Sequence, residues 1–227
     1  MKPNEPVETS RWEIAGIIAL CFGWPIAGSI ASVLGTLGII PAIAKHPSFS
    51  DSYFLRLVLF ELCVGSLALL ILRQRGYALR ELLPTPTLKG SLIGALLYVG
   101  ACVAGAFAIA PFALHHAKEP IDQLMANAAP SMLVVLLLGV VNGLYEEVFV
   151  LGYLVRGLGK YGGSFAIGVS SLIRLLYHLY QGPLGALSIV VFSIVVGTYY
   201  WRTRNLWPVV VAHTVADILP FLLLAAK

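Results

Sequence analysis

Long apolar runs separated by short polar connectors dominate the chain. A membrane-spanning helix needs about 20 mostly apolar residues, and seven runs fall near or above this length. We therefore expect each run to form a spanning helix rather than part of a soluble core. Their approximate bounds are Glu13–Ala44, Tyr53–Leu72, Gly90–Phe112, Ser131–Leu158, Ser164–Tyr180, Pro183–Trp201 and Leu206–Leu224.

The first run, Glu13–Ala44, is long for one span and contains Pro25 and Pro41. Proline removes a backbone donor and kinks or ends a helix, so the run is either one span or two short ones. We expect an all-α fold, a polytopic transmembrane helical bundle of seven spans, or eight if this run divides. The run is too long for the core of a signal peptide and lacks a clear small-residue cleavage site, so we expect it to be retained.

Composition supports a membrane protein. The chain has 227 residues, of which 59% are hydrophobic and 11% charged, whereas an average soluble domain has roughly 25% charged residues. We find no internal repeat and expect a single integral membrane domain over residues 1–227. The three cysteines lie in apolar runs without CxxC spacing, so neither a disulfide framework nor a cysteine metal site is indicated.

The positive charges predict an orientation in the lipid bilayer. Cytoplasmic loops of membrane proteins carry an excess of Lys and Arg, and seven spans would place ten such residues on the N-terminal side and three on the other. We expect a prokaryotic plasma membrane protein with a cytoplasmic N-terminus. The net charge of +4 is small for a nucleic-acid binder, so no nucleic acid partner is expected. The ten are Lys2, Arg11, Arg73, Arg75, Arg80, Lys89, Arg156, Lys160, Arg202 and Arg204, and the three are Lys45, Lys118 and Lys227.

Two further features concern the first half. The connector Arg73–Lys89 is basic and contains proline, and we expect it to hold a short helix at the membrane surface. Small residues let membrane helices approach closely. Close helix contacts are therefore expected in the third run at Gly90, Gly94, Gly100 and Gly105.

Polar and ionisable residues gather in the last four runs. An ionisable side chain at mid-bilayer costs about 2.5–3.5 kcal/mol on insertion scales, so several of them facing lipid would outweigh the net stability of most domains, roughly 5–15 kcal/mol. They must face inward and satisfy one another. This places a site in the segment 131–225, formed by Asn142, Glu146, Glu147, Arg174, His178, His213 and Asp217.

Helical spacing refines this cluster. His213 and Asp217 are four residues apart, so they share a helix face, and an aspartate there can orient the imidazole. Glu146 and Glu147 are adjacent and point about 100° apart on a helix of 3.6 residues per turn. One of them is therefore expected to be catalytic, while the other is structural, for example as a partner of Arg174.

Three short motifs in this half resemble those of the CPBP family of intramembrane proteases. This family comprises CAAX proteases and bacteriocin-processing proteins and is also called the abortive-infection family. Its motifs are EExxxR, FxxxH, and HxxxN or HxxxD. The chain reads EEVFVL from Glu146, RLLYH ending at His178, and HTVAD from His213 to Asp217. The resemblance covers about residues 130 to 220.

The chain departs from these motifs at two positions. Leu151 stands where the family has arginine, and Arg174 stands where the family has an aromatic residue. One change loses a guanidinium and the other gains one on the neighbouring helix. Our hypothesis is that the guanidinium has moved, so that Arg174 pairs with Glu147 from the other side.

The resemblance implies an intramembrane endopeptidase that acts on a membrane-associated protein or peptide. It implies that Glu146 and His178 hold and activate a water molecule, and that His213 with Asp217 stabilises the tetrahedral intermediate. The chain has no HExxH motif, so the sequence does not prove a metal. Two versions of the mechanism therefore stay open, a metal-free glutamate mechanism and a zinc site. The zinc ligands would be Glu147, His178 and His213.

Three other interpretations use the same residues. A proton-coupled transporter also needs intramembrane Glu, His and Arg, but it predicts paired halves with broken helices. A catalytically silent membrane immunity or binding protein predicts that Glu146→Gln and His178→Ala leave function intact. The polar groups could also serve only to hold helices together. The sequence carries no signal for oligomeric state.

Overall fold

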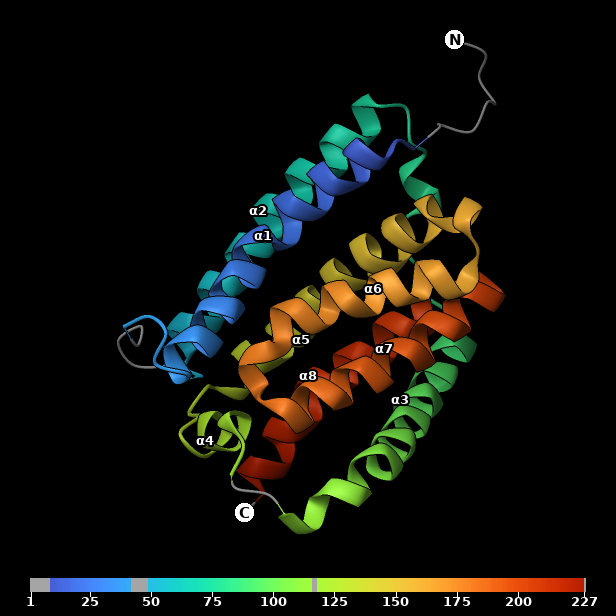
Figure 1. Ribbon diagram of the computed structural model, residues 1–227. Coiled ribbons are helices and arrows are strands. Elements are labelled where there is room, and N and C mark those ends of the chain that lie inside the picture. Colours follow the sequence, from blue (N-terminus) through green and yellow to red (C-terminus); the bar gives the residue numbers. More distant parts are fainter. Residues whose placement is uncertain (1–8, 42–48, 116–117, 227) are drawn as a thin grey trace.

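The computed structural model describes residues 9–41, 49–115 and 118–226. Within these ranges the chain forms helices and no strand, which confirms the predicted all-α bundle. Figure 1 shows the helices crossing the molecule roughly side by side. The α-helices are α1 (Arg11–Thr36), α2 (Asp51–Gln74), α3 (Leu88–Ile109), α4 (Pro120–Ala126), α5 (Met132–Glu147), α6 (Gly163–His178), α7 (Pro183–Thr203) and α8 (Trp207–Ala225).

Short helices of tighter or wider winding connect several of these elements. The expected short helix between the second and third runs is present as the 3₁₀ turn η1. A π-helix, η3, continues α5 directly and replaces a further α-helical turn. These elements are η1 (Leu79–Glu81), η2 (Ala110–His115), η3 (Val148–Val155), η4 (Gly159–Tyr161) and η5 (Leu179–Gln181).

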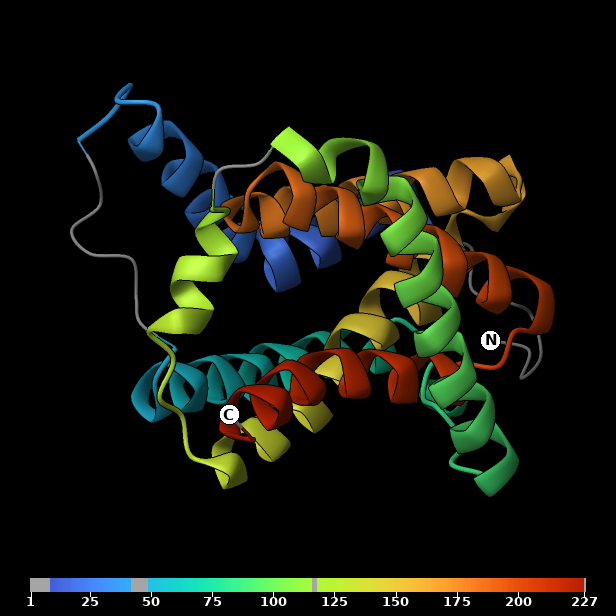
Figure 2. The same cartoon turned by 90° about the horizontal axis from the view of Figure 1, so that it is seen from below.

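Seven long helices form a closed ring. Going round it, α1 contacts α6, α6 contacts α7, α7 contacts α3, α3 contacts α8, α8 contacts α5, α5 contacts α2, and α2 contacts α1. Seen from below (Figure 2), α1, α6 and α7 form one layer, α2, α5 and α8 form the other, and α3 closes one edge. The ring gives each long helix an outer face for lipid and an inner face on which polar groups can meet.

The span count differs in one respect from the prediction. Among the described residues, six helices are long and apolar enough to cross a membrane, and they correspond to six of the seven predicted runs. The run Ser164–Tyr180 corresponds to α6, which has 16 residues and ends at His178. At 1.5 Å per residue, α6 is about 24 Å long, shorter than the roughly 30 Å hydrocarbon core.

The first run is one helix and does not divide. In α1, Pro25 lies inside a continuous helix of 26 residues, so the interpretation as two short spans is wrong for the described residues. The helix ends at Thr36, earlier than expected, and the predicted end at Ala44 lies outside the described residues. Lys2, Lys45 and Lys227, used to predict orientation, also lie outside them.

One end of the bundle gathers positive charge, and we call it the basic end, defined by Arg75, Arg80, Arg156, Lys160 and Arg204. There the helix termini are tied together by side-chain contacts between distant segments. Arg156 bonds to Glu81, and Lys160 approaches the carbonyl of Thr9 at 3.5 Å. These contacts bring the segment after η3 against the start of α1 and against η1.

Glu13 ties α1 to two other segments at the basic end. Its Oε1 accepts hydrogen bonds from the hydroxyls of Tyr77 at 2.5 Å and Tyr153 at 3.1 Å, and its Oε2 pairs with Arg75 Nε at 2.9 Å. Burial and then the bond to Glu13 raise the pKa of Tyr77 to about 12, so this phenol keeps its proton and donates. Through Tyr153, Glu13 fixes α1 beside η3, the π-helix that continues α5.

Candidate active site

The ring brings the predicted residues to its interior from three helices. The two adjacent glutamates end α5 just where the π-helix η3 begins, and such local changes of winding are frequent at functional sites. Helix α6 supplies Arg174 and His178. Helix α8 supplies His213 and Asp217, and Asn142 lies one turn before Glu146 on α5.

Arg174 joins the two glutamates. Its side chain is 2% exposed, with Nη1 donating to Glu146 Oε2 at 3.1 Å and Nη2 to Glu147 Oε2 at 2.6 Å. The predicted pairing of Arg174 with Glu147 is confirmed, and the planar fork also reaches the neighbouring acid. A fork suits two carboxylates that leave the helix in different directions. Leu151, at the position of the family's arginine, lies in the apolar core.

The two glutamates have different surroundings. Glu147 is fully buried, and both its oxygens are engaged, Oε1 with His213 Nδ1 at 2.6 Å and Oε2 with Arg174. The bonds to Glu146 converge on Oε2, whereas Oε1 receives no hydrogen bond from the described residues. Glu147 is therefore fixed in the framework, while Glu146 has an oxygen available for a water molecule.

Glu147, rather than Asp217, holds the ring of His213. Because a carboxylate only accepts, Nδ1 of His213 carries the proton in its bond to Glu147. The other nitrogen, Nε2, faces Asn142 Nδ2 at 3.5 Å, Asp217 Oδ1 at 3.7 Å and Glu146 Oε2 at 3.8 Å. Asp217 instead accepts a hydrogen bond from Asn142 at 2.9 Å. Asp217 thus lies on the same helix face as His213, as predicted, and 3.7 Å from its Nε2, while Glu147 bonds to Nδ1.

His178 has a defined tautomer. Its Nδ1 lies 3.0 Å from the carbonyl oxygen of Arg174, and since a carbonyl only accepts, Nδ1 donates. The neutral ring then presents a lone pair at Nε2. The ring of His178 lies against that of Tyr177, with centroids 4.5 Å apart, and the Tyr177 hydroxyl bonds to Glu146, so His178 lies next to the acidic pair.

Sequence reasoning missed Tyr177. Its hydroxyl donates to Glu146 Oε2 at 2.5 Å, and its ring stacks on Phe22 of α1 with centroids 5.1 Å apart. Tyr177 follows Arg174 by three residues, so the two share a helix face. That spacing was the signal that could have placed Tyr177 beside the acidic pair.

Sequence reasoning also missed Glu61 on α2. Glu61 is 4% exposed, and its Oε2 has no hydrogen-bond partner among the residues that the structure describes. The carboxyl interacts electrostatically with Glu146, Asp217 and His213. The sequence signal that could have found Glu61 is its spacing of three and four residues from the apolar or small residues of α2. This spacing puts one ionisable side chain on the buried face of the helix. The buried stripe of α2 consists of Phe54, Val58, Glu61, Gly65, Ala68 and Leu72.

The predicted zinc ligands do not meet as a ligand set. Among the described residues, no group of three or more His, Cys, Asp or Glu is placed to hold a metal ion. Glu147 has each oxygen bonded to a donor, one of them the guanidinium of Arg174, and a fixed cation at this distance opposes a metal cation on the same carboxylate. The arrangement of the described residues does not fit zinc on Glu147, His178 and His213.

Comparison with models of protein families gives a match in the second half of the chain. Residues 127–219 match a family model described as type II CAAX prenyl endopeptidase Rce1-like. No curated protein and no solved structure matches the chain. The matched segment runs from before α5 into α8 and contains the residues named in the three motifs, so the resemblance to CAAX proteases is confirmed over this segment. At the level of the family, the match supports a CAAX-type intramembrane protease.

Proposed function

Because residues 127–219 match the Rce1-like family of type II CAAX prenyl endopeptidases, we propose that the chain is an intramembrane endopeptidase whose attacking water is activated by Glu146. The observation that carries this proposal is the division between the two glutamates. Glu147 is held on both oxygens, and Glu146 keeps Oε1 without a hydrogen bond among the described residues. A general base needs such an accessible lone pair within reach of the water.

In the proposed reaction, Glu146 Oε1 takes a proton from the water while His178 Nε2 accepts its other hydrogen. The water oxygen bonds to the scissile carbonyl carbon, and the carbonyl π electrons move to oxygen. The protonated Glu146 then returns the proton to the leaving amine as the C–N bond breaks. Proton count is balanced, because the proton taken from water ends on the amine.

The developing oxyanion needs hydrogen-bond donors. Asn142 Nδ2 and, in its doubly protonated form, His213 Nε2 lie 3.5 Å apart and can serve together. Glu147 holds the opposite nitrogen of His213 and so fixes the direction in which Nε2 points. Asp217 positions Asn142 through the 2.9 Å bond between them. The substrate is a membrane-associated protein or peptide that enters the ring.

The test is cleavage of a prenylated CAAX-type peptide by purified protein, comparing wild type with Glu146→Gln. Glutamine can still accept the bonds from Arg174 and Tyr177, but it cannot take the proton. We expect activity to fall by about 10²–10⁴-fold with unchanged thermal unfolding. Retained cleavage in Glu146→Gln would overturn the assigned base. A wild type that cleaves no such peptide would favour the membrane immunity or binding protein.

Metal dependence is tested in the same assay. The metal-free version expects cleavage to survive chelation and the purified protein to contain no stoichiometric zinc. Loss of cleavage on chelation, restored by added zinc, would favour the zinc version instead.

A further inference from the structure

Helix α2 carries one ionisable side chain on its buried face, Glu61. Glu61 is 4% exposed and follows Asp51, the first residue of α2, by ten residues. At 1.5 Å per residue it lies about 15 Å along the helix, near the middle of the span. An ionisable group at this depth is costly and typical of a functional site. Glu61 lies outside residues 127–219, so the family match does not account for it.

The packing of α2 on α5 sets the level of Glu61 in the ring. One turn after Glu61 on the same face, a Cβ on Gly65 would lie 3.1 Å from the ring of Tyr145. One turn before Glu61, this face packs in the apolar cluster that contains Leu138 of α5. The two helices therefore run in the same direction, and their equal rise per residue puts Glu61 at the level of Asn142, between Leu138 and Tyr145.

This level of the ring is that of the candidate active site. Asn142 Nδ2 donates to Asp217 at 2.9 Å and lies 3.5 Å from His213 Nε2. The polar groups of α5 and α8 therefore meet at the depth at which α2 presents its buried acid. Glu61 adds a carboxyl group to the site from a helix that contributes none of the residues used in the proposed reaction.

The charges of the site are unequally compensated. Arg174 and His213 form ion pairs with the other three acids, whereas Oε2 of Glu61 has no hydrogen-bond partner in the described ranges. In this part of the chain, four acids thus stand against one arginine and one histidine, and the balance stays negative even with His213 doubly protonated. A buried carboxylate without a cation is costly, so the site favours a ligand that brings positive charge.

Apolar layers separate Glu61 from both ends of α2. The layer toward the start of the helix consists of Phe49, Phe54, Val58, Val135 and Leu138, and the layer toward the basic end consists of Phe22, Ala68, Leu72, Tyr145 and Phe149. A cation that pairs with Glu61 therefore has to lie at the level of the active site, which is where a peptide must lie to be cleaved.

We propose that Glu61 binds a positively charged group of the substrate peptide, a lysine or arginine side chain close to the scissile bond. The inference rests on the proposed function, because it takes the ring to be the place where the peptide binds. A carboxylate accepts hydrogen bonds from an ammonium or guanidinium group, and such charge complementarity gives an interaction specificity. A peptide with this cation compensates the buried acid and binds more tightly than a neutral one.

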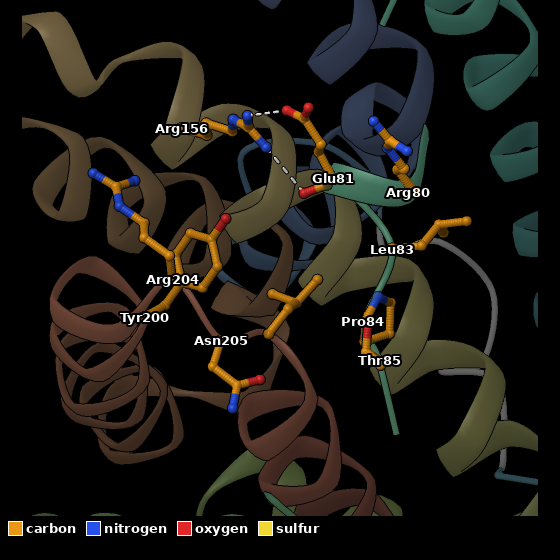
Figure 3. Close-up of a pocket in the computed structure, with 10 residues that line it drawn as sticks. Arg80, Glu81, Leu83, Pro84, Thr85, Arg156, Tyr200, Arg204 and Asn205 are labelled. Carbon is orange, nitrogen blue, oxygen red and sulfur yellow. Dashed lines mark hydrogen bonds and ion pairs between the residues drawn. The ribbon is translucent and has the colours of Figure 1, made fainter. Parts of the chain in front are cut away.

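The test measures binding, with purified protein that carries Glu146→Gln so that bound peptide is not cut. Prenylated CAAX-type peptides carry one lysine at each position near the scissile bond in turn, and each is matched with a peptide that has norleucine there. Affinity is measured by fluorescence anisotropy. The added variant is Glu61→Gln, which keeps the size of the side chain and removes its charge. The matched control is Glu81→Gln, which removes an acid at the basic end, where Figure 3 shows Glu81 paired with Arg156.

We expect lysine at one position to bind about tenfold more tightly than norleucine, equivalent to about 1.4 kcal/mol. Glu61→Gln should lose this preference but bind the norleucine peptide as before, and Glu81→Gln should keep the preference. Equal affinity for both peptides at every position, a preference that survives Glu61→Gln, or loss of both peptides in Glu61→Gln would overturn the proposal. A lysine preference that depends on Glu61, together with no cleavage by the wild type, would overturn the proposed function but keep Glu61 as a binding residue.

Discussion

Arg174 holds together the acidic pair of the candidate site. It is the one cation within hydrogen-bond distance of both glutamates among the described residues. Removing one partner of a buried ion pair leaves the other charge uncompensated, which costs about 3–5 kcal/mol. We expect Arg174→Leu to lower the free energy of unfolding by that amount and to abolish cleavage, measured by denaturant unfolding and by the peptide assay.

The control for this prediction is Arg174→Lys. Lysine is a point charge without the planar fork, so it can neutralise one carboxylate well but not both, and intermediate losses are expected. An Arg174→Leu protein that inserts, folds and cleaves normally would contradict the idea that the guanidinium has moved to this position.

Tyr177 supports Glu146 through a single hydroxyl. Tyr177→Phe keeps the stacking on Phe22 but removes the donor to Glu146 Oε2. Leaving a buried acceptor short of a donor costs about 1–3 kcal/mol, and the unfolding free energy should fall by this amount. Tyr161→Phe, at an exposed residue, is the control and should change little. Equal effects of the two substitutions would argue against the bond.

Replacing Glu61 is expected not to destabilise the protein, in contrast to the substitutions of Arg174 and Tyr177. A buried carboxyl with an unpaired oxygen destabilises the fold, and replacing such a group by an apolar one of similar size is neutral or stabilising. We expect Glu61→Leu to leave the unfolding free energy unchanged or raise it by about 1–3 kcal/mol, while cleavage falls because the cluster loses one acid. A marked loss of stability would mean that the carboxyl has a partner in the membrane-embedded protein.

At the scale of elements, the packing of α3 on α8 determines which glycines of α3 are needed for close helix contact. Of the four glycines predicted to make close contacts in α3, two do so. A Cβ on Gly94 would lie 2.5 Å from the carbonyl oxygen of Pro208 on α8, whereas a Cβ on Gly100 would meet nothing within 4 Å. The glycine pattern correctly indicated that α3 makes close helix contacts. It did not indicate which face of α3 meets α8.

This difference supplies a matched pair of variants on one helix. Gly94→Ala should destabilise the protein by about 1–3 kcal/mol, as overpacking does. Gly100→Ala should be neutral or slightly stabilising, because alanine favours a helix over glycine by roughly 0.5–1 kcal/mol. Thermal unfolding of the two variants measures the contrast, and similar behaviour would contradict the close contact between α3 and α8.

For the whole molecule, the basic end predicts the orientation in the membrane. The excess of Lys and Arg is expected to face the cytoplasm. Single cysteines are introduced as Lys160→Cys at the basic end and Ser52→Cys at the opposite end, with Cys63 and Cys102 replaced by alanine. A membrane-impermeant maleimide added to intact cells should label Ser52→Cys only, and the reverse labelling would show the opposite orientation.

The sequence by itself determined the all-α membrane bundle, most helix bounds, and the set of polar residues that turn inward. These depend on local patterns, namely run length, helical spacing and the penalty for charge in lipid, which act on each helix separately. The pairing of Arg174 with Glu147 could also be predicted, because a lost and a gained arginine stood on neighbouring helices. Tyr177 was missed, although its place three residues after Arg174 could have put it on the same helix face.

Only the tertiary structure decided how the helices close into a ring and which partners meet inside it. It placed Glu61 of α2 beside the last helices and continued α5 as a π-helix. It also assigned the ring of His213 to Glu147 and distinguished the held glutamate from the available one. The physical reason is that hydrogen bonds between helices depend on the rotation and depth of each helix against its neighbours. Packing of side chains far apart in the sequence sets these quantities, and no periodicity within a single run records them.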